Sequence, residues 1–302
     1  MNGPAQLQTL LRQPGIVITP GVYDCLSARL AEAAGFELIG VTGAGVTASA
    51  LGVPDLGLLT MTEIADRVRA IVDSVGIPVV ADCENGYGGP LNVMRTTQVF
   101  ERAGVAGFFI EDQTQDRRCG HFTGKTVIPL EDMVMKIRAA VNARENSDLM
   151  IMARTDARQV EGLASALTRA RAYAEAGADS LFVEAPETKE ELMEVAETLA
   201  DLGLPLKANM AEGGRTPILT APELEAVGYK FAHFPGGCQK VALTAMQGFL
   251  ASLRETGSIG DYYPSKMASL DQRSELLHLD DYLAIEQQLL SETDAIVGDG
   301  GA

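Results

Sequence analysis

The sequence is poor in positive charge. It contains 24 Lys and Arg residues against 41 Asp and Glu residues, which gives a formal net charge of −17 and a pI of about 4.6. A nucleic-acid-binding face or a contact with an anionic membrane needs a stripe of basic residues, so we expect neither partner. A small anionic substrate is not excluded, because a metal ion and a few local arginines reverse the field inside one cleft.

The sequence also lacks long apolar runs and clustered metal-ligating residues. No apolar stretch approaches the roughly 20 residues of a membrane-spanning helix, and Met1–Pro14 lacks the basic start and apolar centre of a signal peptide. The three histidines form no cluster, which argues against zinc. The four cysteines show no paired spacing, so we expect a cytoplasmic protein with reduced thiols.

What the sequence does contain is a repeated β–α pattern. Each apolar run is continuous rather than alternating, as in parallel strands that are buried on both faces. The eight runs are Gly15–Thr19, Leu38–Thr42, Pro78–Asp82, Gly107–Glu111, Leu149–Arg154, Ser180–Glu184, Pro205–Asn209 and Lys230–Phe234.

Amphipathic segments between these runs end at glycine. Leu26–Ala34, Leu91–Ala103, Leu163–Ala176 and Pro222–Val227 are each followed by the glycine that a left-handed helix C-cap needs. Eight such units in 302 residues favour a single α/β domain, a (β/α)8 TIM barrel. A doubly wound open sheet is the alternative, but no Gly-x-Gly-x-x-Gly follows an early strand, and Thr42–Val46 only half resembles one.

The repeated pattern stops near Gly257. We expect residues 1–257 to form the catalytic barrel and residues 258–302 to form a helical C-terminal extension. Asp280–Leu290 predicts one more helix, which a barrel does not need and which we expect to dock on a neighbouring subunit. Gly298–Ala302 predicts a frayed tail.

Polar side chains follow nearly every predicted strand. In such a barrel the active site lies at the carboxyl ends of the strands. A single acid there could be a helix N-cap, but many carboxylates together would repel one another without a cation, and Mg²⁺ fits their oxygen ligands best. The residues at these ends are Thr42, Gly43, Asp82, Glu84, Glu111, Asp112, Arg154, Asp156, Glu184, Asn209 and Pro235.

A loop after the fourth strand carries a thiol. Cys119 lies between Arg117 and Arg118 on one side and Gly120 and His121 on the other, and we expect this positive charge to favour its thiolate. A lone cysteine is more often an apolar filler, but the charged loop favours a function for this one. The remaining cysteines and histidines are interpreted as structural: Cys25, Cys83, Cys238, His233 and His278.

Several of these segments match one known family. From about Gly21 to Ala245 the chain resembles the isocitrate lyase / phosphoenolpyruvate mutase superfamily. The joint match is far more specific than any single short motif. The matching motifs are Gly21-Val22-Tyr23-Asp24, Thr42-Gly43-Ala44-Gly45, Pro54-Asp55-Leu56-Gly57, Ala81-Asp82-Cys83-Glu84-Asn85-Gly86-Tyr87-Gly88, Ile110-Glu111-Asp112-Gln113, Arg118-Cys119-Gly120-His121, Ala153-Arg154-Thr155-Asp156-Ala157 and Asn209-Met210-Ala211-Glu212-Gly213-Gly214.

The resemblance implies a Mg²⁺-dependent barrel enzyme, with Mn²⁺ as an alternative, that acts on α-keto or α-hydroxy acids in carboxylic acid metabolism. The residue that matches Asp82 contacts the metal, and those that match Asp55, Glu84 and Glu111 hold it through water. The family is usually a homotetramer of dimers that swap a C-terminal helix. The resemblance assigns catalysis to Cys119, Arg154, His121 and Glu111, and substrate binding to Tyr23, Thr42, Gly43, Ala44, Asp82, Gly120, His121, Arg154, Glu184, Asn209 and Pro235.

Cys119 separates the branches of this superfamily. Members that cleave carbon–carbon bonds carry the Cys-Gly-His loop, and members that transfer phosphorus generally lack it. The resemblance therefore implies a lyase that cleaves a substituted 2-hydroxy di- or tricarboxylate, of the 2,3-dimethylmalate or 2-methylisocitrate type, to pyruvate and a second carboxylate, with Cys119 as general acid/base. The alternatives are an oxaloacetate hydrolase, although those commonly have Ser in place of Pro235, and a phosphonate-forming mutase.

Two positions depart from the family pattern. Many of its lyases have a tyrosine, proposed to handle the hydroxyl proton, at the position of Gly40. Either Tyr23 or a hydroxide on the metal takes that proton here, or the substrate is different or bulkier. A lysine is common at the position of Arg117. Arginine keeps the charge but does not release a proton.

Overall fold

The computed structural model describes residues 3–298, and its strands form one parallel sheet that closes on itself. The sheet order is β6-β5-β4-β3-β2-β1-β8-β7, and a parallel bridge between Leu181 and Leu206 joins the two ends. The predicted (β/α)8 barrel is therefore confirmed. The strands are β1 (Val17–Val22), β2 (Ile39–Val41), β3 (Val79–Asp82), β4 (Gly107–Glu111), β5 (Met150–Thr155), β6 (Ser180–Val183), β7 (Lys207–Asn209) and β8 (Phe231–Phe234).

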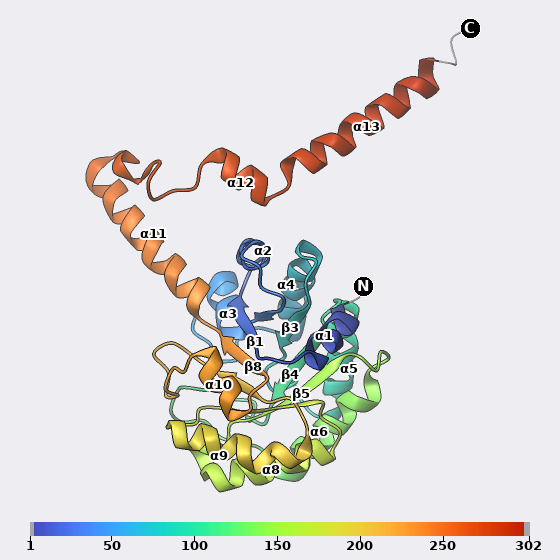
Figure 1. Cartoon of the computed structure of the whole chain (residues 1–302), viewed down its shortest axis with the longest axis vertical. Helices are drawn as coiled ribbons and strands as arrows, with labels where there is room; N and C mark the ends of the chain where they lie inside the picture. The colour runs from blue at the N-terminus through green and yellow to red at the C-terminus, as the bar shows by residue number, and fades with distance from the viewer. Residues whose placement is uncertain (1–2, 299–302) are drawn as a thin grey trace. The chain divides into compact units, whose positions relative to one another are not determined.

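The helices between the strands surround the barrel (Figure 1), and the last two helices named in this paragraph belong to a separate unit described below. One large apolar cluster fills the space between strands and helices, as the continuous apolar runs require. The helices are α1 (Gly3–Arg12), α2 (Cys25–Ala33), α3 (Gly43–Leu51), α4 (Met61–Ser74), α5 (Pro90–Arg102), α6 (Leu130–Ala143), α7 (Ala157–Glu161), α8 (Leu163–Glu175), α9 (Lys189–Leu199), α10 (Ala221–Val227), α11 (Gly237–Thr256), α12 (Leu270–Leu276) and α13 (Leu279–Gly298), with short 3₁₀ turns at Ala200–Leu202 and Gly260–Tyr262.

Local sequence signals fix the helix ends. Thr60 and Glu63 form a capping box at the start of α4, where the Glu63 carboxylate accepts from the Thr60 backbone N–H at 2.8 Å. The glycines predicted as left-handed caps after α2, α5, α8 and α10 all have positive φ, from 85° at Gly104 to 113° at Gly228. The predicted junctions are confirmed.

A second apolar cluster fills the inside of the barrel. It contains Leu38, Val80, Phe109, Phe182 and Phe231 from the strands and Leu7 from α1. Because Leu7 belongs to this cluster, α1 covers the amino-terminal end of the barrel. The carboxyl end is left for the polar residues that follow the strands.

The chain divides into two compact units after Val241. The second unit begins at Ala242 within α11 and includes α12 and α13, and inside it the rings of Phe249 and Tyr262 meet edge to face. The helix predicted at Asp280–Leu290 lies within α13. The boundary predicted after residue 257 stays a prediction, and positions 299–302 of the predicted tail lie outside the described residues. No helix in residues 3–298 combines the length and apolar character needed to cross a membrane.

Candidate active site

A pocket of about 370 Å³ opens at the carboxyl ends of the barrel strands. It brings together most of the residues that the sequence predicts for the site: Thr42, Gly43, Ala44, Asp55, Asp82, Cys119, Gly120, His121, Arg154, Glu184, Asn209 and Pro235. Five predicted residues, Tyr23, Glu84, Glu111, Asp112 and Asp156, do not line this pocket.

The start of α3 forms one wall of the pocket. Thr42 caps this helix, and its hydroxyl accepts from the Gly45 N–H at 3.3 Å. The Gly43 N–H donates to the Asp82 carboxylate at 3.2 Å, and a Cβ on Gly43 would lie 2.9 Å from the same oxygen. A helix N-terminus with free N–H groups is a favourable place for a carboxylate.

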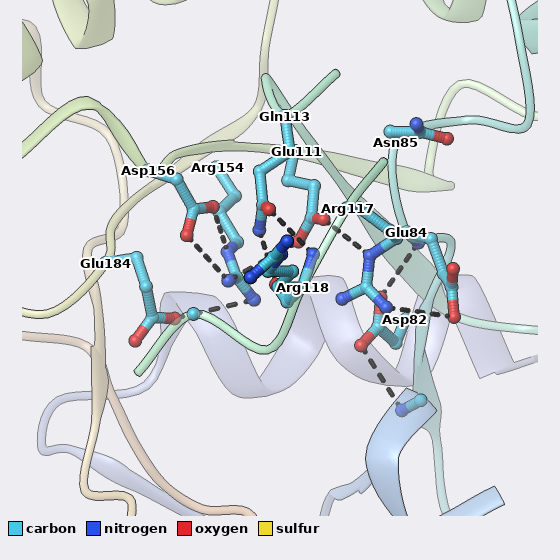
Figure 2. A network of polar contacts seen from close by, with 12 residues as sticks. Asp82, Glu84, Asn85, Glu111, Gln113, Arg117, Arg118, Arg154, Asp156 and Glu184 are labelled. Atoms are coloured by element: carbon cyan, nitrogen blue, oxygen red, sulfur yellow. Dashed lines mark hydrogen bonds and ion pairs between the residues drawn. The ribbon is translucent and has the colours of Figure 1, made fainter. Parts of the chain in front are cut away.

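A second wall contains Arg117 and Asp55, with a buried group of acids around the guanidinium. The Arg117 guanidinium lies 2.7 Å from Glu111 and 3.3 Å from Glu84 (Figure 2). It also lies 2.5 Å from Asp55. Glu84 has a backbone φ of 50°, a left-handed conformation that turns the chain directly after β3. Glu84 and Glu111 therefore lie behind the pocket wall, in contact with Arg117, rather than on its surface.

This acid group has more negative charge than Arg117 compensates. Within residues 3–298, one oxygen of Glu84 and one of Glu111 accept no hydrogen bond, although Arg117 lies 3.3 Å from the first and Arg154 lies 3.4 Å from the second. Burial raises the pKa of Glu84 to about 8 and of Glu111 to about 7, although Arg117 lowers both. In residues 3–298 no three acid, histidine or cysteine side chains form a ready-made metal centre. The Glu84 and Glu111 oxygens that accept no hydrogen bond nevertheless fit a hard divalent cation.

Asp112 does not share this environment, contrary to the expectation that β4 delivers two acids to the site. Its carboxylate accepts from the Thr155 hydroxyl at 2.7 Å, from the Tyr173 hydroxyl at 2.7 Å and from the Asp156 N–H at 2.8 Å. Consecutive residues along a strand point to opposite faces, so Glu111 faces the inside of the barrel and Asp112 faces the helices.

Arg154 occupies the other side of the site. Asp156 binds it through two hydrogen bonds of 2.8 and 3.0 Å, and Glu184 lies 3.4 Å away (Figure 2). Lys125 holds Asp156 in turn at 2.7 Å. Burial works against the Glu184 and Asp156 carboxylates, but Arg154 and Lys125 outweigh it and hold the pKa of both below the usual range. Asp156 serves as the partner of Arg154 and does not line the pocket.

His121, Glu184 and Asn209 form a connected polar cluster. The Arg215 N–H donates to His121 Nδ1 at 3.1 Å, so in the neutral ring the proton is on Nε2, which lies 3.1 Å from Glu184. The Asn209 amide donates to Glu184 at 3.2 Å. This orients the polar edge of the pocket opposite α3.

The loop that carries Cys119 is fastened at both ends. Gln113 and Val127 form an antiparallel bridge at its base, and the Cys119 N–H donates to the Asp55 carbonyl at 3.3 Å. Lys125 donates to the Gly120 carbonyl at 2.5 Å. In this conformation the loop covers one side of the pocket and places the thiol on its lining.

The expectation of a favoured thiolate is wrong for this conformation. Burial raises the pKa of Cys119 to about 11, and Asp55 and Glu184 add to the rise. Arg117 points to the acids, and Arg118 is exposed and reaches the Thr123 carbonyl. The arginines are neighbours of the thiol in sequence, but their charge is used elsewhere.

The floor of the pocket contains residues that the sequence interpretation missed. Phe109, Phe182, Lys207 and His233 all line it, although His233 had been interpreted as structural. Lys207 is two positions before Asn209 on β7, and His233 pairs with Asn209 in the sheet register. A search of the inward-facing strand positions one layer below the strand ends would have found them.

Comparison with known proteins identifies the family. The family model described as phosphoenolpyruvate phosphomutase matches residues 7–254. A 2,3-dimethylmalate lyase from Eubacterium barkeri is 43% identical over 95% of this chain and 98% of its own. A 2-methylisocitrate lyase from Aeropyrum pernix is 44% identical over 84% of this chain and 81% of its own.

One solved structure adds a relative with another chemistry. An oxaloacetate acetylhydrolase in complex with the inhibitor 3,3-difluorooxalacetate superposes with a TM-score of 0.90 at 36% identity, over 95% of this chain and 97% of that one. Enzymes of this family use a divalent metal ion. The extent of these matches confirms the resemblance read from the motifs: this chain belongs to the phosphoenolpyruvate mutase / isocitrate lyase superfamily.

Proposed function

We propose that this protein is a lyase that cleaves a carbon–carbon bond in a substituted 2-hydroxy di- or tricarboxylate, such as 2,3-dimethylmalate or 2-methylisocitrate, and releases pyruvate and a second carboxylate. The observation that carries the proposal is the Cys119 thiol on the lining of a pocket that also contains Arg154 and the start of α3. Two related proteins that align over most of this chain are lyases of these two substrates.

The proposed cofactor is Mg²⁺, with Mn²⁺ as an alternative. Asp82 would hold it directly, and Asp55, Glu84 and Glu111 would hold it through water. When bound, a divalent cation polarises the oxygens of a 2-hydroxy acid and lowers the pKa of its hydroxyl. The buried oxygens of Glu84 and Glu111 that accept no hydrogen bond within residues 3–298 support this assignment.

The substrate is bound by groups that face it from several sides. Thr42, Gly43 and Ala44 would bind the carboxylate of the pyruvate unit at the start of α3. Arg154, rigidly held by Asp156, would compensate the charge that develops on the substrate. His121, Glu184 and Asn209 would contact the rest of the substrate, and Gly120 and Pro235 would limit the space available to it.

The proposed role of Cys119 is to protonate the carbanion that bond cleavage creates. A protonated, partly buried thiol suits a general acid in the direction of cleavage, and its thiolate would act as the base in the reverse direction. The loop Gln113–Val127 would exclude water, so that the carbanion meets the thiol before it meets another proton donor.

Two other activities remain as alternatives. The superposition with an oxaloacetate acetylhydrolase favours hydrolysis of oxaloacetate to oxalate and acetate as the second candidate. Pro235 lines the pocket at the position where such hydrolases commonly have Ser, which favours the lyase. A phosphonate-forming mutase ranks below both, because Cys119 has no use in it.

The test is a panel assay of pyruvate release with and without Mg²⁺, on 2,3-dimethylmalate, 2-methylisocitrate, citramalate and oxaloacetate. Turnover of phosphonopyruvate to phosphoenolpyruvate is measured separately for the mutase. We expect Mg²⁺-dependent pyruvate from at least one of the three hydroxy acids. Conversion of oxaloacetate to oxalate and acetate, with no pyruvate from the hydroxy acids, would replace the lyase by the hydrolase.

We also propose that the protein is a cytoplasmic homotetramer in which residues 258–302 form an extension that docks on a neighbouring subunit, with α13 swapped within each dimer. Leu283, Leu290 and Ile296 on α13 are exposed in the single chain, which supports a covering partner. Light scattering on the full chain and on a chain that ends at residue 257 is the test. The same number of subunits in the truncated and the full-length protein would contradict the swap.

A further inference from the structure

The absence of a side chain at Gly40 makes room for His233. A Cβ on Gly40 would lie 2.6 Å from Cε1 of the His233 ring, closer than real Cβ atoms approach, and a tight 3.2 Å from its Nδ1. Gly40 is on β2 and His233 on β8, and β1 lies between these strands in the sheet. The imidazole therefore reaches across β1 and occupies the space that a side chain at position 40 would need.

The hydrogen bonding of His233 defines its tautomer. Nδ1 lies 3.0 Å from the Thr19 carbonyl oxygen. A carbonyl only accepts, so Nδ1 carries the proton and, in a neutral ring, Nε2 has a free lone pair. The structure gives Nε2 no hydrogen-bond partner among residues 3–298. His233 is 4% exposed and lines both the pocket and a smaller cavity beneath its floor, which it shares with Gly40 and Thr19.

Lys207 lies next to His233 and shares the floor with it. Its Nζ is 4.1 Å from the centre of the Phe109 ring and 4.6 Å from that of Phe182, and no salt bridge to it occurs among residues 3–298. Burial lowers the pKa of Lys207 to about 7. Burial and the charge of Lys207 together hold the pKa of His233 well below its ordinary value. The other charged groups that act on this pair are Asp82, Arg154 and Glu184.

We propose that His233 is the base that removes the hydroxyl proton of the 2-hydroxy acid, and that Lys207 is a positioning residue that keeps the imidazole neutral until this step. The inference rests on the lyase function proposed above. It assigns to a β8 residue the proton transfer that the family pattern at position 40 would otherwise supply.

The step balances without a further reactant. The hydroxyl O–H bond breaks and its proton moves to His233 Nε2. The oxygen electron pair forms the carbonyl of pyruvate as the adjacent carbon–carbon bond breaks. The pair from that bond remains on the departing carbon, which takes the proton of the Cys119 thiol. Burial, together with Lys207 while it is protonated, disfavours a lasting imidazolium, so the proton returns through solvent to the thiolate when the products leave.

The kinetic test uses His233→Gln, which keeps a polar side chain of similar length but removes the base. We expect kcat to fall about 10²–10⁴-fold, with little change in KM and none in inhibition by oxalate, which has no hydroxyl proton to give up. His278→Gln, in the second unit, is the control and should be fully active. If the wild-type enzyme is active and His233→Gln has the same kcat, the inference alone is overturned. If the wild-type enzyme is inactive on the hydroxy acids, the lyase function is overturned and the inference with it.

A second readout does not use activity. The chain has three histidines, so ¹⁵N-labelled imidazoles can be assigned by single substitutions. We expect His233 to show the neutral Nδ1–H tautomer at pH 6–8. An imidazolium signal for His233 at pH 7 would overturn the assignment.

The positioning role of Lys207 is tested with Lys207→Met. Removal of the charge should raise the His233 pKa and move the acid limb of the kcat/KM profile upward by about one pH unit. Lys230→Met is the matched control and should leave the acid limb in place. Lys230 directly precedes β8 and donates to the Gln13 and Gly15 carbonyls, outside the pocket. An unmoved limb in Lys207→Met would refute the role of Lys207.

Discussion

Two buried arginines divide the pocket into halves that differ in charge balance. Arg154 is on a strand, and the carboxylates of its partners Asp156 and Glu184 have lowered pKa values. Arg117 is on a loop, and the pKa values of its partners Glu84 and Glu111 are raised by burial. Among the described residues, one oxygen of each accepts no hydrogen bond and has an arginine only at 3.3–3.4 Å, Arg154 in the case of Glu111. The Arg154 half is electrostatically complete in the protein alone, whereas the Arg117 half has the surplus negative charge that a cation would compensate.

The largest effect is expected from breaking the complete half. Arg154→Met leaves the carboxylates of Asp156 and Glu184 buried with too little positive charge. We expect a loss of about 3–5 kcal/mol in the free energy of unfolding, measured in urea, and the loss of pyruvate release. Arg158→Met removes a half-buried pair with Glu191 outside the pocket and should cost about 1 kcal/mol. Equal losses in the two variants would contradict the account of the Arg154 half.

The next effect separates chemistry from binding. Cys119→Ala should lower kcat for pyruvate release by about 10²–10⁴-fold, because the thiol supplies a proton and few contacts. Binding of Mg²⁺ and of pyruvate, measured by calorimetry, should persist. Turnover at the wild-type rate would remove Cys119 from the mechanism.

A smaller effect sharpens the contrast on the incomplete side. Arg117→Met removes the protein's own compensation of Asp55, Glu84 and Glu111, so a divalent cation should stabilise this variant more than it stabilises the wild type. The measurement is the shift in Tm on addition of Mg²⁺. Arg118→Met, next in sequence but exposed, is the matched control and should behave as wild type. Identical shifts in Arg117→Met and wild type would show that arginine and cation do not serve the same acids.

The smallest effect concerns the pocket floor below both halves. The folded state holds Lys207 with a pKa of about 7, below its ordinary value, so between pH 7 and about 10 the unfolded chain binds more protons there and stability rises with pH. Lys207→Met should remove this rise, at most about 1.4 kcal/mol per pH unit, as measured by urea unfolding at pH 7, 8 and 9. Exposed Lys189→Met is the control. A wild-type rise that persists in Lys207→Met would mean that another group causes it.

The sequence predicted the barrel because its determinants are local. A strand buried on both faces must be an apolar run, and the glycine after α2, α5, α8 and α10 is required by a positive φ, as at Gly228. Residues at the strand ends could also be predicted, because barrel geometry brings those ends together whatever the loops do.

The errors in the candidate site have a common physical cause. Residues that are neighbours in sequence can point their side chains in different directions, and residues far apart in sequence can meet. Cys119 follows two arginines, yet Arg117 turns to the acids and Arg118 to solvent, so burial rather than positive charge governs the thiol. Asp112 follows Glu111, yet the strand sends it to the opposite face. His233 reaches the pocket only because Gly40, distant in sequence, leaves space for its ring.

The most direct measurement follows the proton in the proposed cleavage. The wild-type enzyme would be given 2,3-dimethylmalate and Mg²⁺ in D₂O, and the products examined by NMR. The account predicts pyruvate together with propionate that carries one deuterium on its second carbon, delivered from the exchanged Cys119 thiol. Propionate without deuterium at that carbon, or no cleavage of this or any other 2-hydroxy acid of the panel, would contradict the central claim that this pocket breaks a carbon–carbon bond and protonates the carbanion.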